Sequence, residues 1–291
     1  MRSKLALLFA TLASALVVAT PTSAVTGNFE KDFIHPYVGL VVFYDASGEF
    51  SHRCSGTLIA PSVFLTAGHC TEGVSTARIY FQQDVGGRYD PVLEIDPLTG
   101  YPEECFQGHP LCVTSDELYT FGDPVFGSFP NTQDVGLVIL DEPIFLADYP
   151  DLAVAGALDE LATRRGLQDV TFTVSGYGVS RINPVQLESF RERLMATAKL
   201  VGVRSALTRG FNLQTSANPG GGRGGTCFGD SGGPVFYSDT EIIVAVTSFG
   251  LNPNCRGVDF AYRIDQADVL AWILAHTPTS EQQYIEIVPL P

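Results

Sequence analysis

The sequence predicts an all-β protein whose strands pair antiparallel. Short segments rich in Val, Ile, Phe, Tyr and Thr recur along the chain and are separated by Gly and Pro. Helical periodicity is sparse and does not alternate with these segments, which argues against a parallel sheet. With 291 residues, 45% of them hydrophobic and 17% charged, the chain can form one or two globular domains with a sizeable core. Antiparallel barrels or sandwiches are the architectures that fit.

Six segments are the clearest strand candidates, because each combines β-branched or aromatic residues with turn-forming neighbours. In chain order they are residues 37–44, 54–59, 135–140, 170–174, 234–237 and 242–249. The sequence has no repeat period.

One helix is predicted, over residues 265–276, where Asp265 would cap the N-terminus. The residues that would face the core at helical spacing are Val269, Leu270, Trp272 and Ile273. A weaker signal over residues 151–163 fits either a helix or a loop with one helical turn. The C-terminal tail, residues 277–291, contains proline and acidic residues and is expected to be loosely ordered.

Residues 1–24 resemble a secretion signal and are not read as part of the fold. Arg2 and Lys4 precede an apolar run from Leu5 to Val18, and residues 22–24 (Thr-Ser-Ala) offer a small-residue cleavage site. The run is short for a membrane span, and an uncleaved anchor is the alternative. We therefore expect a secreted, extracellular protein.

Secretion would favour disulfide bonds among the six cysteines. Many pairings are possible, and the sequence alone does not choose among them. No two cysteines have CxxC spacing and histidines do not cluster beside them, so a zinc site is a weak alternative. Proximity along the chain suggests the pairs Cys54–Cys70, Cys105–Cys112 and Cys227–Cys255.

Three short segments carry residue types suited to nucleophilic catalysis: residues 65–70 (LTAGHC), 133–137 (QDVGL) and 227–234 (CFGDSGGP). A serine hydroxyl is a poor nucleophile at neutral pH. It becomes reactive when an imidazole removes its proton and a buried carboxylate orients that imidazole. The candidates for base, orienting acid and nucleophile are His69, Asp134 and Ser231.

Each segment also has a simpler interpretation. His69 could be a core histidine at a turn, and Asp134 could be a residue that begins a strand. Residues 229–233 (GDSGG) also satisfy the G-x-S-x-G pattern of α/β-hydrolases, which requires the acid and the histidine to follow the serine. After Ser231 the only histidine is His276, near the end of the predicted helix. The order His, Asp, Ser in a strand-rich chain favours the triad described above.

These segments resemble those of the trypsin-like (chymotrypsin-fold) serine proteases, and the similarity covers nearly all of residues 25–276. Residues 54–59 (CSGTLI) are similar to the lead-in to the family's histidine segment, and residues 174–178 (VSGYG) match loosely, with Tyr where Trp is usual. Residues 248–250 (SFG) resemble the strand that pairs with substrate. The resemblance implies two six-stranded antiparallel β-barrels with the active site in the cleft between them. It also implies hydrolysis of peptide bonds through an acyl-enzyme.

The resemblance assigns further roles within the motifs. The backbone N–H groups of Gly229 and Ser231 would form the oxyanion hole. Signal cleavage would expose Val25, at the start of a segment similar to the family's mature N-terminus. Its ammonium would pair with Asp230, because a buried carboxylate needs a partner. We therefore expect signal cleavage itself to yield the active form.

The specificity pocket departs from the family pattern. The position six before the nucleophile, which is Asp in relatives that select Arg and Lys, is Gly225 here. If residues 260–264 align without gaps, Asp259 occupies the opposite pocket wall and supplies an anion there. We hypothesise that Asp259 gives basic or broadened specificity, whereas a slipped register would place Gly257 there and leave an apolar pocket. The other pocket residues that the resemblance implies are Ser248 and Gly250.

Residues 84–123 form a longer connection than is typical of the family, with nine Asp or Glu residues and one Arg. We expect a solvated surface insertion stapled by the Cys105–Cys112 pair. Calcium could bind such clustered carboxylates, although EF-hand spacing is absent. The chemistry needs no metal and no cofactor.

The formal net charge of −15 disfavours nucleic acid and anionic membranes as partners. Protein or peptide substrates are expected, acted on by a monomer. Two alternatives are a catalytically inactive, protease-like binding module and an esterase of the same fold. The inactive module would be expected to have lost at least one residue of the triad.

Overall fold

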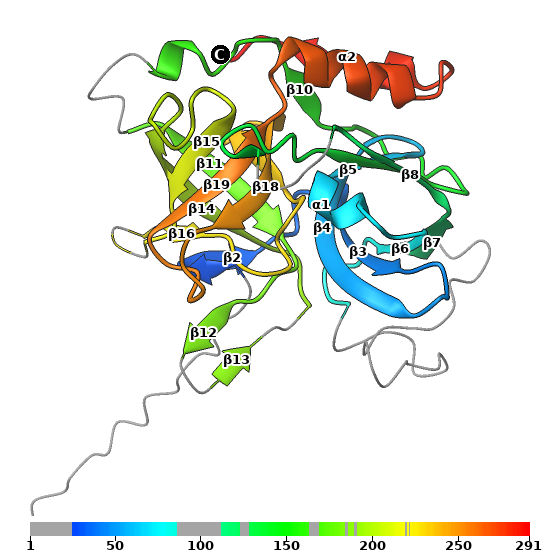
Figure 1. The fold of residues 1–291 in the computed structure, drawn as a ribbon, viewed down its shortest axis with the longest axis horizontal. Coiled ribbons are helices and arrows are strands. Elements are labelled where there is room, and N and C mark those ends of the chain that lie inside the picture. Colours follow the sequence, from blue (N-terminus) through cyan, green and yellow to red (C-terminus); the bar gives the residue numbers. More distant parts are fainter. Residues whose placement is uncertain are drawn as a thin grey trace, which may run out of the picture.

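The computed structural model describes residues 25–85, 112–122, 128–162, 169–183, 186–188, 191–218, 220 and 222–291. It is mostly β, with two curled sheets side by side and a C-terminal helix, as the sequence predicts (Figure 1). The predicted signal peptide and most of the acidic segment 84–123 lie outside these residues. Within the described ranges, no helix has the length and apolarity needed to cross a membrane.

The N-terminal sheet has seven antiparallel strands in the order β7-β6-β3-β4-β5-β9-β8. In chain order they are β3 (Val38–Tyr44), β4 (Phe50–Ala60), β5 (Val63–Thr66), β6 (Thr76–Tyr80), β7 (Cys112–Ser115), β8 (Glu117–Thr120) and β9 (Gly136–Ile139). Only Asp116 separates β7 from β8, although these strands pair with opposite ends of the sheet. Counted as one bent strand, β7 and β8 complete the six-stranded curl that the resemblance implies.

The C-terminal barrel is closed by six strands in the order β17-β11-β14-β15-β19-β18, because β17 also pairs with β18. They are β11 (Thr171–Gly176), β14 (Leu194–Gly202), β15 (Asn212–Ser216), β17 (Pro234–Tyr237), β18 (Ile242–Gly250) and β19 (Val258–Arg263). Along β14, buried side chains alternate with more exposed ones, as expected for a strand with one face on the core.

Shorter elements extend this barrel. β2 (Phe29–Lys31) pairs with β14, and β10 (Asp151–Ala153) pairs in parallel with both β18 and β20 (Ile287–Val288). Two small ribbons are formed by β1 (Thr26–Gly27) with β16 (Gly224–Gly225) and by β12 (Arg181–Asn183) with β13 (Gln186–Glu188). Within the described residues, the helices whose bounds are defined are α1 (Gly68–Thr71), α2 (Ala267–His276) and the 3₁₀ turns η2 (Glu160–Ala162) and η3 (Gln282–Tyr284).

The weak signal at residues 151–163 proves to be a strand followed by a turn and η2. β10 takes the first three residues of this segment. Its parallel partners lie far away in the chain, and local periodicity does not report such pairing.

The predicted cap of α2 is wrong. Gln266 precedes the helix without a side-chain cap bond. The buried carboxylate of Asp265 instead accepts hydrogen bonds from the Arg263 guanidinium, at 2.7 and 2.6 Å, and from the Leu158 N–H at 2.8 Å. A charge-assisted pair inside the fold is stronger than a local cap bond. The predicted core residue Trp272 is only partly buried, whereas the other three are buried.

The tail is ordered, contrary to the prediction. After α2 the chain forms η3 and β20, and β20 adds a strand to β10. The Glu281 carboxylate accepts the Ser62 N–H at 2.7 Å and the Ser62 hydroxyl at 2.9 Å, at the turn between β4 and β5. The tail therefore ties the C-terminal end of the chain to the N-terminal sheet, a long-range contact that composition does not reveal.

Two of the expected disulfides are confirmed, Cys54–Cys70 and Cys227–Cys255. The expected Cys105–Cys112 pair lies outside the described residues, since Cys105 is not among them. Cys112 itself is buried at the start of β7.

Candidate active site

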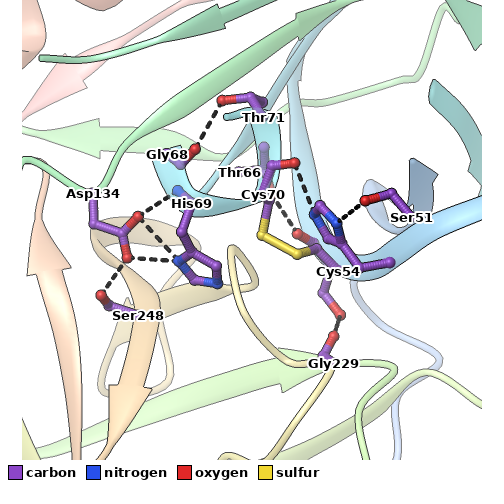
Figure 2. The surroundings of a disulfide bond; sticks show 12 residues. Ser51, Cys54, Thr66, Gly68, His69, Cys70, Thr71, Asp134, Gly229 and Ser248 are labelled. Atoms are coloured by element: carbon purple, nitrogen blue, oxygen red, sulfur yellow. Dashed lines mark hydrogen bonds and ion pairs between the residues drawn. A yellow bond between two sulfur atoms is a disulfide. The ribbon is translucent and has the colours of Figure 1, made fainter. Parts of the chain in front are cut away.

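His69 lies in α1, the helical turn that follows β5 where the two sheets meet (Figure 1). The next residue, Cys70, is bonded to Cys54 of β4, so the turn is fixed to the sheet on one side (Figure 2). On the other side, the Asp134 carboxylate accepts the His69 backbone N–H at 2.8 Å and lies 2.9 and 3.1 Å from Nδ1 of the ring. The carboxylate thus holds both the backbone and the ring of His69.

The charges of this pair support each other. Burial alone would raise the pKa of Asp134, but the adjacent His69 and the Ser248 hydroxyl outweigh it and hold that pKa below its usual value. Burial alone would lower the pKa of His69, but the Asp134 carboxylate more than offsets it and raises that pKa. Asp134 is therefore an anion that favours a protonated imidazole.

Ser248 has a contact that the sequence did not indicate. Although it lines the cavity described below, its hydroxyl donates a short hydrogen bond to Asp134 (Figure 2). A carboxylate that receives several donors is fixed in orientation and stays ionised. Ser248 of β18 therefore helps to hold an acid that belongs to the other sheet.

Ser231 lies in a turn whose backbone is bonded to both sheets. Its carbonyl accepts the Ser55 N–H from β4 at 2.8 Å, and the Gly232 N–H donates to the Thr247 carbonyl of β18 at 2.7 Å. Gly232 has a φ of +79°, and an added Cβ would lie 2.0 Å from the Thr66 hydroxyl. The turn thus requires glycine directly after Ser231.

The preceding peptide units present two N–H groups. The Phe228 carbonyl accepts the Val179 N–H at 2.7 Å, and because a trans peptide directs its C=O and N–H oppositely, the Gly229 N–H faces away from Val179. Gly229 has a φ of +95°, and its carbonyl accepts the Ser55 hydroxyl at 2.8 Å. Across the described residues, neither the Gly229 nor the Ser231 N–H has a partner within the chain.

A cavity of about 440 Å³ joins the candidate catalytic residues to the candidate pocket residues. It is lined by His69, Thr226, Cys227, Phe228, Ser231, Thr247, Ser248, Phe249, Gly250, Leu251, Asn252, Pro253, Cys255 and Asp259. Five of the predicted site residues, His69, Ser231, Ser248, Gly250 and Asp259, therefore lie around one cavity.

Asp259, and not Gly257, lines this cavity. It is 5% exposed on β19, and its Oδ2 accepts the Thr226 N–H at 2.7 Å. Burial raises the pKa of Asp259 to about 6. Gly225 lies alongside, and a Cβ added there would lie 2.6 Å from Asp259 Oδ2 and 2.4 Å from the Ala217 Cβ. Glycine at 225 leaves the space that the carboxylate fills.

Aromatic rings support one wall of the cavity, a feature missed in the sequence. Phe249 stacks on Phe260 with ring centroids 4.7 Å apart and planes within 5°, and Phe129 packs edge-on at 5.9 Å from Phe249. The signal available was an aromatic residue directly after Ser248. Its stacking partner comes from β19 and could not be paired with it locally.

Asp230 is fully buried and accepts the Cys227 N–H at 2.9 Å and the Gly178 N–H at 2.8 Å. Burial raises the pKa of Asp230 to about 7. Val25 is also fully buried, and the next residue, Thr26, pairs with Gly225 of β16. The predicted ammonium–carboxylate pair requires a free N-terminus at Val25, which the full-length chain does not have.

One cluster has the composition of a metal site. Side-chain atoms of Cys54, His69 and Cys70 lie within 4.8 Å of one another, the one such group in the described part of the chain. The two sulfur atoms are bonded to each other and are not free to bind a metal.

Comparison with known proteins gives concordant matches. A family model described as Trypsin matches residues 33–273. The chain is 25% identical over 235 residues to "Serine protease ea" of Drosophila melanogaster, covering 75% of this chain and 58% of the relative. It is 26% identical over 193 residues to "Chymotrypsin-like elastase family member 3B" of Homo sapiens, covering 66% and 64%. The chain thus spans about three fifths of the length of these two relatives.

Solved structures agree on the fold. An HL collagenase structure superposes with a TM-score of 0.63 at 17% identity, covering 86% of this chain and 96% of that chain. Human heparin binding protein superposes with a TM-score of 0.59 at 20% identity, covering 91% and 99%.

Proposed function

Because the chain belongs to the trypsin family of serine proteases, we propose that it is a secreted serine endopeptidase acting through His69, Asp134 and Ser231. The observation that carries the proposal is the Asp134 carboxylate on Nδ1 of His69, with His69 and Ser231 lining one cavity. The cavity is complete within one chain, which supports action as a monomer on protein or peptide substrates.

The chemistry follows from these positions. Ser231 Oγ attacks the scissile carbonyl carbon while His69 Nε2 takes its proton, and Asp134 stabilises the resulting imidazolium. His69 then gives that proton to the leaving amine as the C–N bond breaks, which leaves an ester on Ser231. Water attacks the ester with His69 again as the base, and the acid product leaves as Ser231 regains its proton.

The tetrahedral intermediates carry an oxyanion that requires fixed donors. The N–H groups of Gly229 and Ser231 are proposed for this role, because neither is used within the described chain and the turn holding them is bonded to both sheets. Donors that need no reorganisation stabilise the transition state more than the substrate.

The substrate residue preceding the scissile bond would enter the 440 Å³ cavity. Among the described residues that line it, Asp259 is the only acidic one, and its carboxylate favours Lys or Arg, while Phe249 and Leu251 offer apolar contact. We therefore assign basic or broad specificity, with an apolar preference as the competing outcome. A cation placed beside the Asp259 carboxylate would also compensate for its burial.

Activation is proposed to follow signal cleavage after residue 24. The new Val25 ammonium would pair with Asp230, whose burial otherwise raises its pKa to about 7. The pairing of Thr26 with Gly225 supports this, because it already holds the segment against the pocket wall.

The deciding experiment compares wild-type protein with Ser231→Ala on panels of peptide and ester substrates and with an organophosphonate probe. We expect wild-type cleavage of peptides, with loss of both hydrolysis and labelling in the variant. Labelling at another residue would refute the assignment, ester hydrolysis alone would indicate an esterase, and an inert wild-type protein would indicate a binding module.

A further inference from the structure

The surface around residues 30–35 has no part in the catalytic cavity, yet it has the features of a binding site. We propose that this surface, formed by Glu30, Phe33, Ile34, His35 and Asp239 and called here the Phe33 surface, binds a basic and apolar segment of a separate protein. This binding is independent of hydrolysis.

The first observation is an exposed apolar pair. Phe33 is 68% exposed and the adjacent Ile34 is 62% exposed. Two other exposed apolar residues, Phe228 and Leu251, line the catalytic cavity and are explained by substrate. Adjacent exposed apolar side chains mark a surface where a partner can bury them.

The second observation is that the turn carrying this pair is rigidly held. Asp32 is fully buried, and its Oδ1 accepts the N–H groups of Ile34 at 3.1 Å and His35 at 3.0 Å. Its Oδ2 lies 2.8 Å from His35 Nδ1 and accepts the Ser175 hydroxyl at 2.5 Å. A flexible loop could fold its apolar residues inward, but this turn holds Phe33 and Ile34 in solvent.

The buried residue Arg193 also holds this turn through hydrogen bonds with the Asp32 backbone. Arg193 Nε donates to the Asp32 carbonyl at 3.1 Å, and the Asp32 N–H donates to the Arg193 carbonyl at 2.9 Å. The exposed pair is therefore preorganised, which lowers the entropic cost of binding.

The third observation is a cavity of about 250 Å³ beside the pair. It is lined by Glu30, Ile34, His35, Thr173, Met195, Ala196, Thr197, Asp239 and Thr240. The carboxylates of Glu30 and Asp239 are in exposed residues, and no lysine or arginine is among these lining residues. The nearby Lys31 ammonium is paired with Glu192 at 2.8 Å.

The residues that line this cavity favour a positively charged side chain with an aliphatic stem. An ammonium or guanidinium group would meet two carboxylates and the threonine hydroxyls, while the aliphatic stem of its side chain would pack on Ile34 and Met195. An apolar neighbour in the same segment would then reach Phe33. A second copy of this chain is disfavoured, since its net charge is −15 and the cavity is acidic.

The test measures binding of a fluorescent peptide of alternating Arg and Leu by anisotropy. The protein carries Ser231→Ala so that the peptide is not cleaved, and Asp259→Asn so that the catalytic cavity does not attract its arginines. We expect saturable binding that weakens with salt, and a Glu–Leu peptide of the same length should not bind. Phe33→Ser and the double variant Glu30→Gln/Asp239→Asn should each weaken binding on the order of tenfold.

Matched controls come from an exposed phenylalanine and an exposed aspartate elsewhere, Phe145 and Asp148. Phe145→Ser and Asp148→Asn should bind the peptide as the parent protein does. Equal losses in the controls, or undiminished binding by the Phe33 surface variants, would overturn the proposal. So would a dimer in sedimentation that Phe33→Ser dissociates, since the occupant would then be a second copy.

Hydrolysis of a short peptide by the Phe33→Ser variant with Ser231 intact should equal that of wild type, because Phe33 does not line the catalytic cavity. The proposal for the Phe33 surface and the proposed protease activity are therefore tested by separate measurements.

Discussion

The two sheets bury carboxylates in opposite electrostatic settings. Asp134, from the N-terminal sheet, is 3% exposed, and its pKa is lowered because His69 and Ser248 outweigh burial. Asp230 and Asp259, from the C-terminal barrel, are 0% and 5% exposed, and burial raises their pKa values to about 7 and about 6. Backbone N–H groups donate to the carboxylates of Asp230 and Asp259. These hydrogen bonds do not offset the effect of burial on the two pKa values.

The two regions therefore differ in whether their buried carboxylates already have a cationic partner. In the N-terminal sheet, Asp134 already has its cationic partner in His69, 2.9 Å from Nδ1, without any further group. The C-terminal barrel holds two acids that a cation would stabilise: the Val25 ammonium for Asp230 and a basic substrate side chain for Asp259. Under the proposed function, charge in the first region is preorganised for the reaction, whereas in the second region it would couple the site to cleavage before Val25 and to a basic substrate.

The largest effect is expected where the preorganised pair is broken. Asp134→Asn should lower kcat about 10⁴-fold at neutral pH, because His69 loses the anion that fixes its tautomer. Steady-state kinetics on a peptide substrate measures this loss. Ser248→Ala, which removes one donor and keeps the anion, should cost far less, and an equal loss would show that the carboxylate's orientation matters more than its charge.

Breaking the proposed pair between Asp230 and the Val25 ammonium, from either side, should have the next largest effect. In the mature enzyme, Asp230→Asn should lower kcat/KM on the order of 10²–10³-fold, comparable to losing an oxyanion donor, because residues 227–231 are held through this carboxylate. An extra glycine before Val25 should do the same by displacing the ammonium.

N-terminal sequencing of the active secreted enzyme provides the control. A start at Val25 is expected. A start well downstream, or full activity of the extended form, would show that Asp230 is stabilised by another group.

Asp259 should give a smaller, pH-dependent effect on specificity. Its carboxyl is neutral below about pH 6 and ionised above it, so the preference for Arg over Phe should rise with pH by roughly tenfold to hundredfold. The ratio of kcat/KM values for matched Arg and Phe substrates isolates this change, since titration of His69 affects both substrates alike. Asp259→Gly should abolish the rise, and an unchanged preference in that variant would refute the role of Asp259.

The candidate triad could be predicted from sequence because each residue lies in a short contiguous motif. Asp259 could be proposed as a pocket residue because only the register of one strand was needed, and it does line the cavity. The hydroxyl of Ser248 on Asp134 could not be foreseen, because it joins residues 114 positions apart across the two sheets.

The same reason explains the errors elsewhere. The predicted cap residue Asp265 binds Arg263 and Leu158, and the tail is ordered by Ser62 and β10. In each case the observed structure is set by a partner distant in the chain, or by a buried ion pair that is stronger than the local helix or loop preference. Local composition carries no information about such partners.

The effect with the least consequence for activity concerns stability. Asp230 and Asp259 retain their protons up to about pH 7 and pH 6 in the folded chain, but ionise near 3.8 when unfolded. Unfolding therefore releases protons between about pH 4 and 7, and the free energy of unfolding falls as pH rises through that window. The lowered pKa of Asp134 acts in the opposite sense, because its contribution is lost only as pH falls below about 3.8.

Thermal melts of the uncleaved Ser231→Ala protein across this pH range test the contrast between the two regions. Asp259→Asn, which cannot ionise, should remove about 3 kcal/mol of this decline, equivalent to roughly 6–12 °C in Tm. The exposed-site variant Asp148→Asn should leave the curve parallel to that of the parent. In the cleaved protein the Val25 ammonium should hold Asp230 ionised and remove its share of the decline. Identical curves before and after cleavage would mean that the new N-terminus does not reach Asp230.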